Sequence, residues 1–421
     1  MNREIPGEKA RPSWGWLVVA ASTIMMFGYY GTSGSFGIFL KPIVEMLDST
    51  RAVASGAMST FMGLNGLTGI IAGRLTDRYG PRVIIGTSAL LGGLGYLLMY
   101  QVSSIWQIHV FFGIMVGSSM GACFTPIIAT VSKWFTEKRV LAVGITTVGI
   151  GMGQMVLPPL VAYFIANYGW RPAYFMLAIT VWITTVPAMV LLGRKPPQST
   201  AVFSRRQSNR ASEDDDIEIS KLPREWSARE AVRTTPFWMF IIIGFVTATG
   251  FYFILIHIVA YATDMGIVPT TAALILTFLS VGVIAAQLLV WFLTVRINSR
   301  FTIVTLLVLQ ALALFFLTGV TSFQMLMALG LAYGFGFGGS NTVRLSMISD
   351  IFGTKSAGAI LGLVSIAWAT GGIVGPILAG YIFDLSQSYD VAFLAGGSLL
   401  AIGAMSGFFL KAPVGLKKLT Q

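Results

Sequence analysis

The sequence has almost no cysteine, few histidines and little charge. Its 421 residues include one cysteine, Cys123, and two histidines, His109 and His257. These leave no material for a disulfide framework, a zinc site or an iron–sulfur cluster, so we expect no bound metal and no cofactor. Charged residues make up only 11% of the chain. A soluble domain of this size needs more charge to cover its surface, so a soluble protein is excluded.

Long apolar runs take the place of the missing charge. Hydrophobic residues make up 55% of the chain and the mean hydropathy is +0.77. Twelve stretches approach or exceed the roughly 20 residues that a helix needs to cross a bilayer. We therefore predict an all-α membrane protein with twelve transmembrane helices. The stretches are 14–38, 53–73, 83–101, 106–131, 140–166, 173–192, 236–262, 270–294, 302–319, 324–348, 357–383 and 391–410.

The positive charges gather on one side of this predicted bundle. A net charge of +11 in a soluble protein would suggest a nucleic-acid partner, but here the placement decides. Of the 28 Lys and Arg residues, all except Lys41, Arg51, Arg171 and Arg344 fall in segments that share one face of the membrane. This asymmetry predicts a multi-pass protein of the inner (plasma) membrane with both termini in the cytoplasm, and it removes the argument for nucleic acid.

One polar stretch, 193–235, separates six predicted helices from six. Two patterns recur across it at nearly the same offset: Gly149–Pro159 is echoed by Gly371–Pro376, and Tyr168–Phe175 by Tyr389–Phe393. Matched glycines and prolines in two halves are typical of transporters built from repeats. We expect an N-terminal six-helix bundle, a cytoplasmic linker and a C-terminal six-helix bundle related by pseudo-symmetry, at 1–193, 194–235 and 236–421.

A charged motif, Gly73-Arg-Leu-Thr-Asp-Arg-Tyr-Gly-Pro-Arg82, follows the second predicted helix. Its carboxylate, Asp77, lies between arginines that can pair across the cytoplasmic mouth, which would give a latch. The alternative is a basic turn that only sets topology. In the second half Val295 stands at the equivalent place. The motif resembles the loop signature of the major facilitator superfamily, and the gating residues that we expect are Arg74, Asp77, Arg78 and Arg82.

Within that superfamily the chain resembles the monocarboxylate transporter group. The first-helix motif of the group is met by Ser13-Trp-Gly-Trp16, although Arg11 and Pro12 replace its acid and glycine. The fifth-helix motif is met by residues 134–149, from the Trp-Phe pair through Lys-Arg to Leu-Ala-Val-Gly and a final glycine. The resemblance implies the superfamily fold, alternating access, and movement of small carboxylates with a proton.

Ionisable residues inside membrane helices are costly, so each is a candidate for function. His257 and Asp264 lie seven residues apart on the seventh predicted helix, on one face and about 10 Å apart along its axis. They could titrate in sequence as a proton moves, and bacterial relatives in the group have a similar pair. The alternatives are a solvated helix-end residue for Asp264, beside Gly266 and Pro269, and a histidine hydrogen-bonded within the bundle for His257.

A carboxylate substrate needs a buried cation as its partner. In the relatives this is an arginine on the eighth helix, but here Gln287 occupies the place. Arg344 lies at a similar predicted depth on the tenth helix, and we expect it to bind the anion with help from Asn341 and Tyr333. The alternative is that Arg344 extends to the interface or pairs with Asp350.

Further polar residues could line a substrate site. Polar side chains of this kind more often form hydrogen bonds between helices of a membrane bundle, so these residues are weaker candidates. They are Tyr29, Tyr30, Asn65 and Gln154, together with Gln287.

Three functions remain open. The first is a proton-coupled symporter of a small monocarboxylate of the lactate or pyruvate type, with the lipid bilayer as its surroundings. The second is a carboxylate exchanger or an exporter of another small solute, because the eighth-helix arginine is missing and the fifth helix is rich in glycine. The third is a membrane receptor on a transporter scaffold. No nucleophile or nucleotide loop stands in the sequence, so we do not expect an enzyme. The oligomeric state cannot be predicted.

Overall fold

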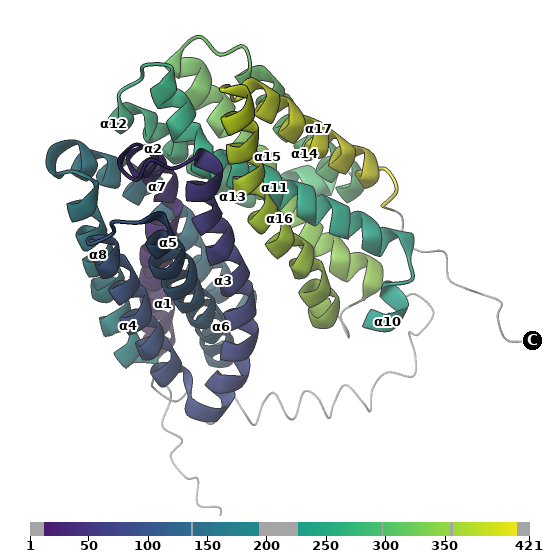
Figure 1. Ribbon diagram of the computed structural model, residues 1–421. Helices are drawn as coiled ribbons and strands as arrows, with labels where there is room; N and C mark the ends of the chain where they lie inside the picture. Colours follow the sequence, from purple (N-terminus) through teal and green to yellow (C-terminus); the bar gives the residue numbers. More distant parts are fainter. Residues whose placement is uncertain (1–11, 136–137, 193–225, 297, 354–356, 411–421) are drawn as a thin grey trace, which may run out of the picture.

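The computed structural model describes residues 12–135, 138–192, 226–296, 298–353 and 357–410. Within these ranges the chain is helical throughout, with no strand (Figure 1). The first half consists of α1 (Pro12–Gly34), α2 (Phe36–Met46), α3 (Arg51–Tyr79), α4 (Pro81–Met99), α5 (Ile105–Ile108), the π-helix η1 (His109–Val116), α6 (Gly117–Trp134), α7 (Arg139–Tyr168) and α8 (Trp170–Leu192). The second half consists of α10 (Ala228–Ala231), α11 (Thr235–Asp264), α12 (Pro269–Ala272), α13 (Leu274–Arg296), α14 (Ser299–Leu317), α15 (Phe323–Phe352), α16 (Ala357–Ser386) and α17 (Asp390–Gly407).

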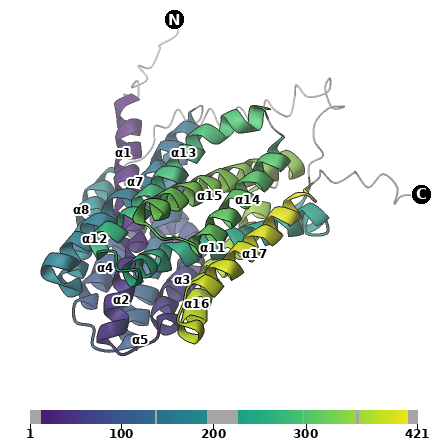
Figure 2. The same ribbon diagram turned by 90° about the horizontal axis from the view of Figure 1, so that it is seen from above.

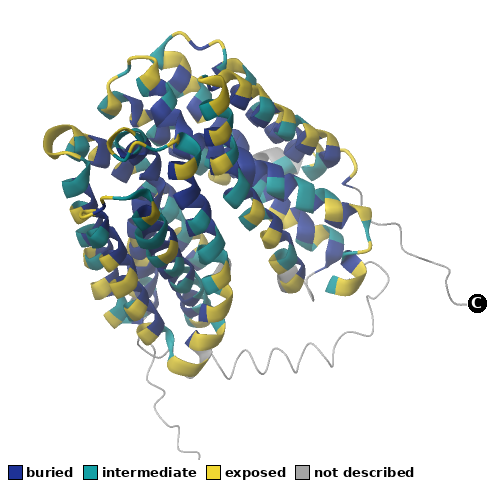
Figure 3. Ribbon diagram, in the orientation of Figure 1, coloured by how far each residue is buried: buried dark blue, intermediate teal, exposed yellow. Residues whose placement is uncertain are grey.

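The surface of the molecule is apolar along most of these helices. In the described part of the chain, nine helical segments are long and apolar enough to cross a membrane. The segments α1–α2, α3 and α15 contain more glycine and polar residues and complete the set of twelve. Leu90, Ile183 and Leu288 are 63%, 67% and 66% exposed. Figure 3 shows exposed positions along the helices of both groups. A lipid environment accommodates such a surface, and helices satisfy their own backbone groups there, so the predicted fold class is confirmed.

The turn between α3 and α4 shows how the motif at residues 73–82 ends one helix and starts the next. Gly80 has φ +82°, a conformation that favours glycine, and its N–H donates to the Thr76 carbonyl at 2.9 Å. Pro81 then begins α4, where its missing N–H would have had no helical partner. The short loop therefore holds the two helices antiparallel.

The glycine-rich stretch of the fifth predicted helix lies against α1. A Cβ added at Gly31 would lie 2.6 Å from the carbonyl oxygen of Gly153, so the two backbones touch. Small residues allow this approach, which fixes the angle between α1 and α7.

The helices form two groups, α1–α8 and α10–α17, that stand side by side (Figures 1 and 2). Contacts between them run along α3 with α16, α7 with α13, and α2 with α11. The Ser55 hydroxyl of α3 donates to the Pro376 carbonyl of α16 at 2.9 Å. The Ser59 hydroxyl donates to the Ile373 carbonyl at 2.6 Å. The ribbons converge at this level and diverge toward the α3–α4 turn and α10, and we call these the closed end and the open end (Figure 1).

The predicted linker, 194–235, lies outside the described residues as far as position 225. Its last part contacts the second half. The backbone N–H of Trp226 donates to the Phe352 carbonyl at 3.0 Å, and the Trp226 side chain is buried. Helix α10 follows, with Ser227 as its N-cap, and contacts α16. The chain thus enters the second half at the open end.

Candidate functional site

Arg344 of α15 is a buried cation with no anionic partner among the side chains that the structure describes. Its side chain is 6% exposed, and its Nη2 donates to the Oδ1 of Asn341 at 2.7 Å. Within the described part of the chain its Nη1 has no hydrogen-bond partner. No carboxylate among the described side chains lies within ion-pair distance of it. A buried charge is tolerated only when it is paired, so an anion beside Nη1 would stabilise this guanidinium.

The surroundings of Arg344 argue against the alternatives given above. Asp350 is exposed and accepts a hydrogen bond from Ser346 at 3.4 Å, so it does not pair with Arg344. The guanidinium instead turns toward α11 and α16. A Cβ added at Gly244 would lie 2.6 Å from its Nη1, and the Trp368 ring centroid lies 5.4 Å from its Cζ. The side chain therefore points into the bundle interior.

The other predicted substrate residues are only partly brought together. Asn341 holds Arg344, as described. Tyr333 lies about 16 Å away along α15, and its hydroxyl is buried beside the position of Gly250. Gln287 is exposed on α13, away from this buried site.

In the first half, the Tyr29 hydroxyl lies 3.1 Å from the Ser119 Oγ and is engaged within its own bundle. Tyr30 and Asn65 are partly buried, and the Tyr30 ring meets Phe124 edge-on at 6.2 Å.

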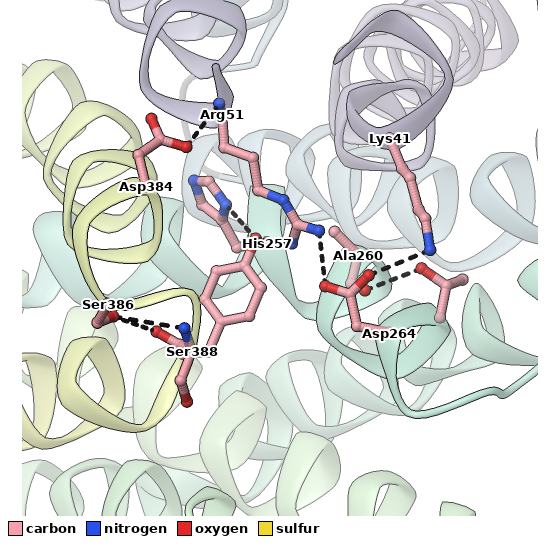
Figure 4. A network of polar contacts seen from close by, with 10 residues as sticks. Lys41, Arg51, His257, Ala260, Asp264, Asp384, Ser386 and Ser388 are labelled. Atoms are coloured by element: carbon pink, nitrogen blue, oxygen red, sulfur yellow. Dashed lines mark hydrogen bonds and ion pairs between the residues drawn. The ribbon is translucent and has the colours of Figure 1, made fainter. Parts of the chain in front are cut away.

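A polar network joins the two halves at the closed end (Figure 4). Asp264, the last residue of α11, pairs with Lys41 of α2 at 3.1 Å and with Arg51 of α3 at 2.7 Å. It is thus a helix-end residue, as the alternative supposed, but it carries two ion pairs to the other half. The network therefore includes one of the two predicted proton-coupling residues.

Arg51 connects this ion pair to His257. Its Nη1 donates to the Tyr389 hydroxyl at 2.7 Å, and its guanidinium lies 3.7 Å from the Phe383 ring centroid. Burial raises the pKa of the Tyr389 hydroxyl, against a smaller lowering by the Arg51 charge, so this group stays neutral and can donate. The Nδ1 of His257 lies 3.0 Å from the same hydroxyl.

The hydrogen bonds of His257 define its protonation in this conformation. Its Nε2 lies 3.0 Å from the Pro376 carbonyl oxygen, which only accepts, so Nε2 carries a proton. The Tyr389 hydroxyl accepts from Arg51 and can donate its own hydrogen to Nδ1. These partners suit a neutral imidazole with both ring nitrogens hydrogen-bonded.

Asp384 of α16 completes the closed end. Its two oxygens accept from the backbone N–H groups of Arg51, at 3.0 Å, and Ala52, at 2.9 Å. These are free donors at the start of α3, so the carboxylate caps that helix from the other half of the molecule.

Sequence reasoning missed most of this network. It treated Lys41 and Arg51 only as loop cations and did not consider Asp384 or Tyr389 as site residues. One signal was available: Asp384 stands two residues before the end of α16, as Asp77 does in α3.

The predicted gating residues lie at the open end. Arg74, Arg78 and Arg82 are exposed, and the Arg78 guanidinium lies 5.3 Å from the Tyr79 ring centroid. Asp77 belongs to α3, but its side chain lies outside the described ones. The latch function of this motif thus stays a prediction.

Two groups of apolar helices that meet at the closed end, with ionisable residues between them, are the arrangement of a membrane carrier. The sequence model of the Major Facilitator Superfamily matches residues 22–268 and 242–420, and the chain belongs to that superfamily.

Among its relatives are monocarboxylate transporters, in agreement with the resemblance noted from the sequence. Monocarboxylate transporter 13 of Rattus norvegicus is 27% identical over 95% of this chain and 89% of its own length. Monocarboxylate transporter 2 of Homo sapiens is 24% identical over 93% of this chain and 84% of its own length.

A solved structure shows the same fold. It is a bacterial homologue of the human lysosomal transporter Spinster, in an inward-facing and unoccupied conformation, with a TM-score of 0.70, 14% identity and 95% coverage of both chains.

Proposed function

We propose that the protein moves a small monocarboxylate, of the lactate or pyruvate type, together with a proton by alternating access. The observation that carries the proposal is the buried guanidinium of Arg344, which has a free N–H and no carboxylate partner among the described side chains. A singly charged anion would neutralise it without leaving a second buried charge. Asn341 orients the guanidinium and keeps its own amide N–H₂ for the ligand.

His257 and Asp264 are the proposed proton-coupling residues. In the present conformation Arg51 donates to the Tyr389 hydroxyl, which in turn donates to Nδ1 of a neutral His257. When the closed end opens, Arg51 leaves with the first half, so the Tyr389 hydroxyl can turn to accept from a protonated Nδ1, and the Asp264 carboxylate loses its cations and can take a proton. Closing the end again restores the ion pairs and expels the proton, which couples proton movement to the gate.

Alternating access needs a second gate at the open end, and Arg74, Asp77, Arg78 and Arg82 are the proposed elements of it. The excess of Lys and Arg at this end supports a cytoplasmic orientation in the plasma membrane, with both termini inside. Tyr30 and Asn65 are the proposed contacts of the first half with substrate, since both are partly exposed. Tyr29, Gln287 and Tyr333 would support the site from a distance.

Uptake of labelled pyruvate and lactate into proteoliposomes tests this function. With the outside more acidic than the inside, the wild type should accumulate substrate, and Arg344→Gln should reduce uptake at least tenfold. Arg229→Gln removes an exposed arginine of α10 and is the matched control, which should leave uptake unchanged. His257→Gln should keep exchange of internal for external substrate but lose accumulation driven by the pH gradient.

The outcomes separate the alternatives. Flux that ignores the pH gradient but requires substrate on the opposite side would replace symport by exchange. Absence of flux for every small acid, in a protein that remains folded, would leave a receptor on a transporter scaffold.

A further inference from the structure

Four aromatic rings form a closed ring of contacts next to Arg344. Phe251 stacks on Phe337 with centroids 4.0 Å apart, and Phe337 lies 5.8 Å from Trp368. Trp368 meets Tyr252 edge-on at 6.4 Å, and Tyr252 meets Phe251 at 5.3 Å. The cluster thus links α11, α15 and α16 by ring contacts alone; we call it the aromatic layer.

The aromatic layer lies directly on the closed-end side of the guanidinium. Arg344, Gly244 and Val364 meet at one level, because a Cβ at Gly244 would touch both of the other side chains. Phe337 precedes Arg344 by seven residues, and Phe251 follows Gly244 by seven, which is two helical turns or about 10 Å in each helix. Trp368 stands one turn beyond Val364. Along each of the three helices, going from the open end to the closed end, the level of Arg344 comes first and the aromatic layer comes next.

Two rings of the aromatic layer are buried, and the other two are partly exposed. Phe251 and Phe337 are 5% and 7% exposed and fill the bundle interior. Tyr252 and Trp368 are only partly buried. From the first half, Met62 lies beside Tyr252, since a Cβ added at Gly372 would be 2.9 Å from the Met62 Cε and 3.1 Å from the Tyr252 ring. A molecule on Arg344 would thus extend along ring faces of the second half, next to a side chain of the first half.

We propose that the substrate is a monocarboxylate with an aromatic body, such as an aryl-substituted 2-oxo acid. Its carboxylate accepts from the Nη1 of Arg344 and the amide of Asn341, and its ring lies against Trp368 and Tyr252. Lactate and pyruvate have the same head group but are too short to use the aromatic layer. This inference rests on the proposed function, because it assigns the substrate class of the same site.

Binding of pyruvate and phenylpyruvate to the purified full chain, followed by thermal shift and by competition in counterflow, tests the inference. The two acids differ only in the phenyl group. The phenyl group of phenylpyruvate can make two aromatic contacts, with Trp368 and Tyr252, that pyruvate cannot make. These contacts predict that phenylpyruvate binds roughly 5- to 150-fold more tightly than pyruvate. Cyclohexylpyruvate, with a saturated ring, should fall between them.

Substitutions at Trp368 and Arg344 test which side chain recognises the phenyl group and which recognises the carboxylate. Trp368→Leu should remove most of the advantage of phenylpyruvate, measured as the ratio of the two affinities within the same variant, whereas Trp368→Phe should keep most of that ratio. Arg344→Gln should weaken both acids alike, because it removes the partner of their common carboxylate. Size-exclusion elution of each variant confirms that it is folded.

Two results would overturn the inference in distinguishable ways. If pyruvate binds as tightly as phenylpyruvate, and both depend on Arg344, the aromatic body is wrong while carboxylate transport stands. If phenylpyruvate and its uncharged analogue phenylacetone bind equally well, with or without Arg344, the carboxylate site itself is wrong and the proposed function falls with it.

Discussion

Lys41 and Arg51 both form an ion pair with Asp264, but the Lys41 side chain is far more exposed than that of Arg51. The Lys41 side chain is 36% exposed, whereas that of Arg51 is 11% exposed. Exposed ion pairs contribute little because water and salt screen them. Arg51 also stacks on Phe383 and bonds Tyr389, so its removal leaves several groups without a partner. The two cations are therefore unequal in what they stabilise.

We predict that Arg51→Gln opens the closed end far more than Lys41→Gln. The reporter is Ser55→Cys in a Cys123→Ala background, because Ser55 is fully buried between the halves at this end. The rate of maleimide labelling should rise at least tenfold for Arg51→Gln. For Lys41→Gln it should rise less than about fivefold, as for an exposed pair of up to about 1 kcal/mol. Equal rates for the two variants would show that Arg51 has no special part in the gate.

At the scale of elements, α3 and α16 are related by the way each ends. Both have an aspartate two residues before the last residue, Asp77 in α3 and Asp384 in α16. Asp384 caps the start of α3 at the closed end.

Asp384→Ala should loosen the closed end without unfolding either bundle. Loss of an N-cap costs about 0.5–2 kcal/mol, which corresponds to a rise of roughly 2- to 30-fold in the labelling rate of the same reporter cysteine. Asp390→Ala is the control: Asp390 is exposed in the first turn of α17 at the same end. If both substitutions change labelling to the same extent, general charge rather than capping is responsible.

The contact of α1 with α7 depends on individual glycines. The backbone of α1 touches Gly153, so Gly153→Ala inserts a methyl group where no space exists, at a cost of about 1–3 kcal/mol. A Cβ at Gly144, on the same helix, meets nothing within 4 Å. Gly144→Ala should therefore be neutral or stabilising by up to about 1 kcal/mol, since alanine favours the helix.

Thermal unfolding of the purified variants checks this prediction. The midpoint should fall clearly for Gly153→Ala and stay or rise for Gly144→Ala. A similar fall for both would indicate that the glycines act through backbone flexibility rather than through close packing.

On the scale of the whole molecule, the sequence predicts those features that depend on a continuous stretch of residues, such as a membrane-spanning helix. The apolar stretches predicted the helices, because lipid requires continuous apolar length and internal hydrogen bonding. Arg344 was found because a charge in such a stretch stands out. The contacts of Arg51 with Asp264 and Asp384 could not be predicted, because they join helices far apart in sequence, and their register is set only when the two bundles meet. Tyr333 was wrongly grouped with Arg344 for a related reason. Both residues lie on α15, but about three helical turns separate them along that helix.

The meeting of the bundles also gives the last prediction. A Cβ at Gly66 of α3 would lie 3.7 Å from the Cβ of Ala369 in α16, a spacing that a disulfide accepts. In a Cys123→Ala background, the pair Gly66→Cys and Ala369→Cys should oxidise readily and tie the halves together in this conformation. Transport in proteoliposomes should stop on oxidation and return on reduction.

Ligand binding distinguishes a locked carrier from a damaged one. Arg344 and Asn341 belong to the second half and do not change on cross-linking, so the oxidised protein in detergent should bind carboxylate within about twofold of the reduced protein. The single-cysteine variants should transport normally under the same oxidant. Undiminished transport by the cross-linked protein would mean that α3 and α16 do not separate at this level during the cycle, and alternating access by movement of the two bundles would have to be abandoned.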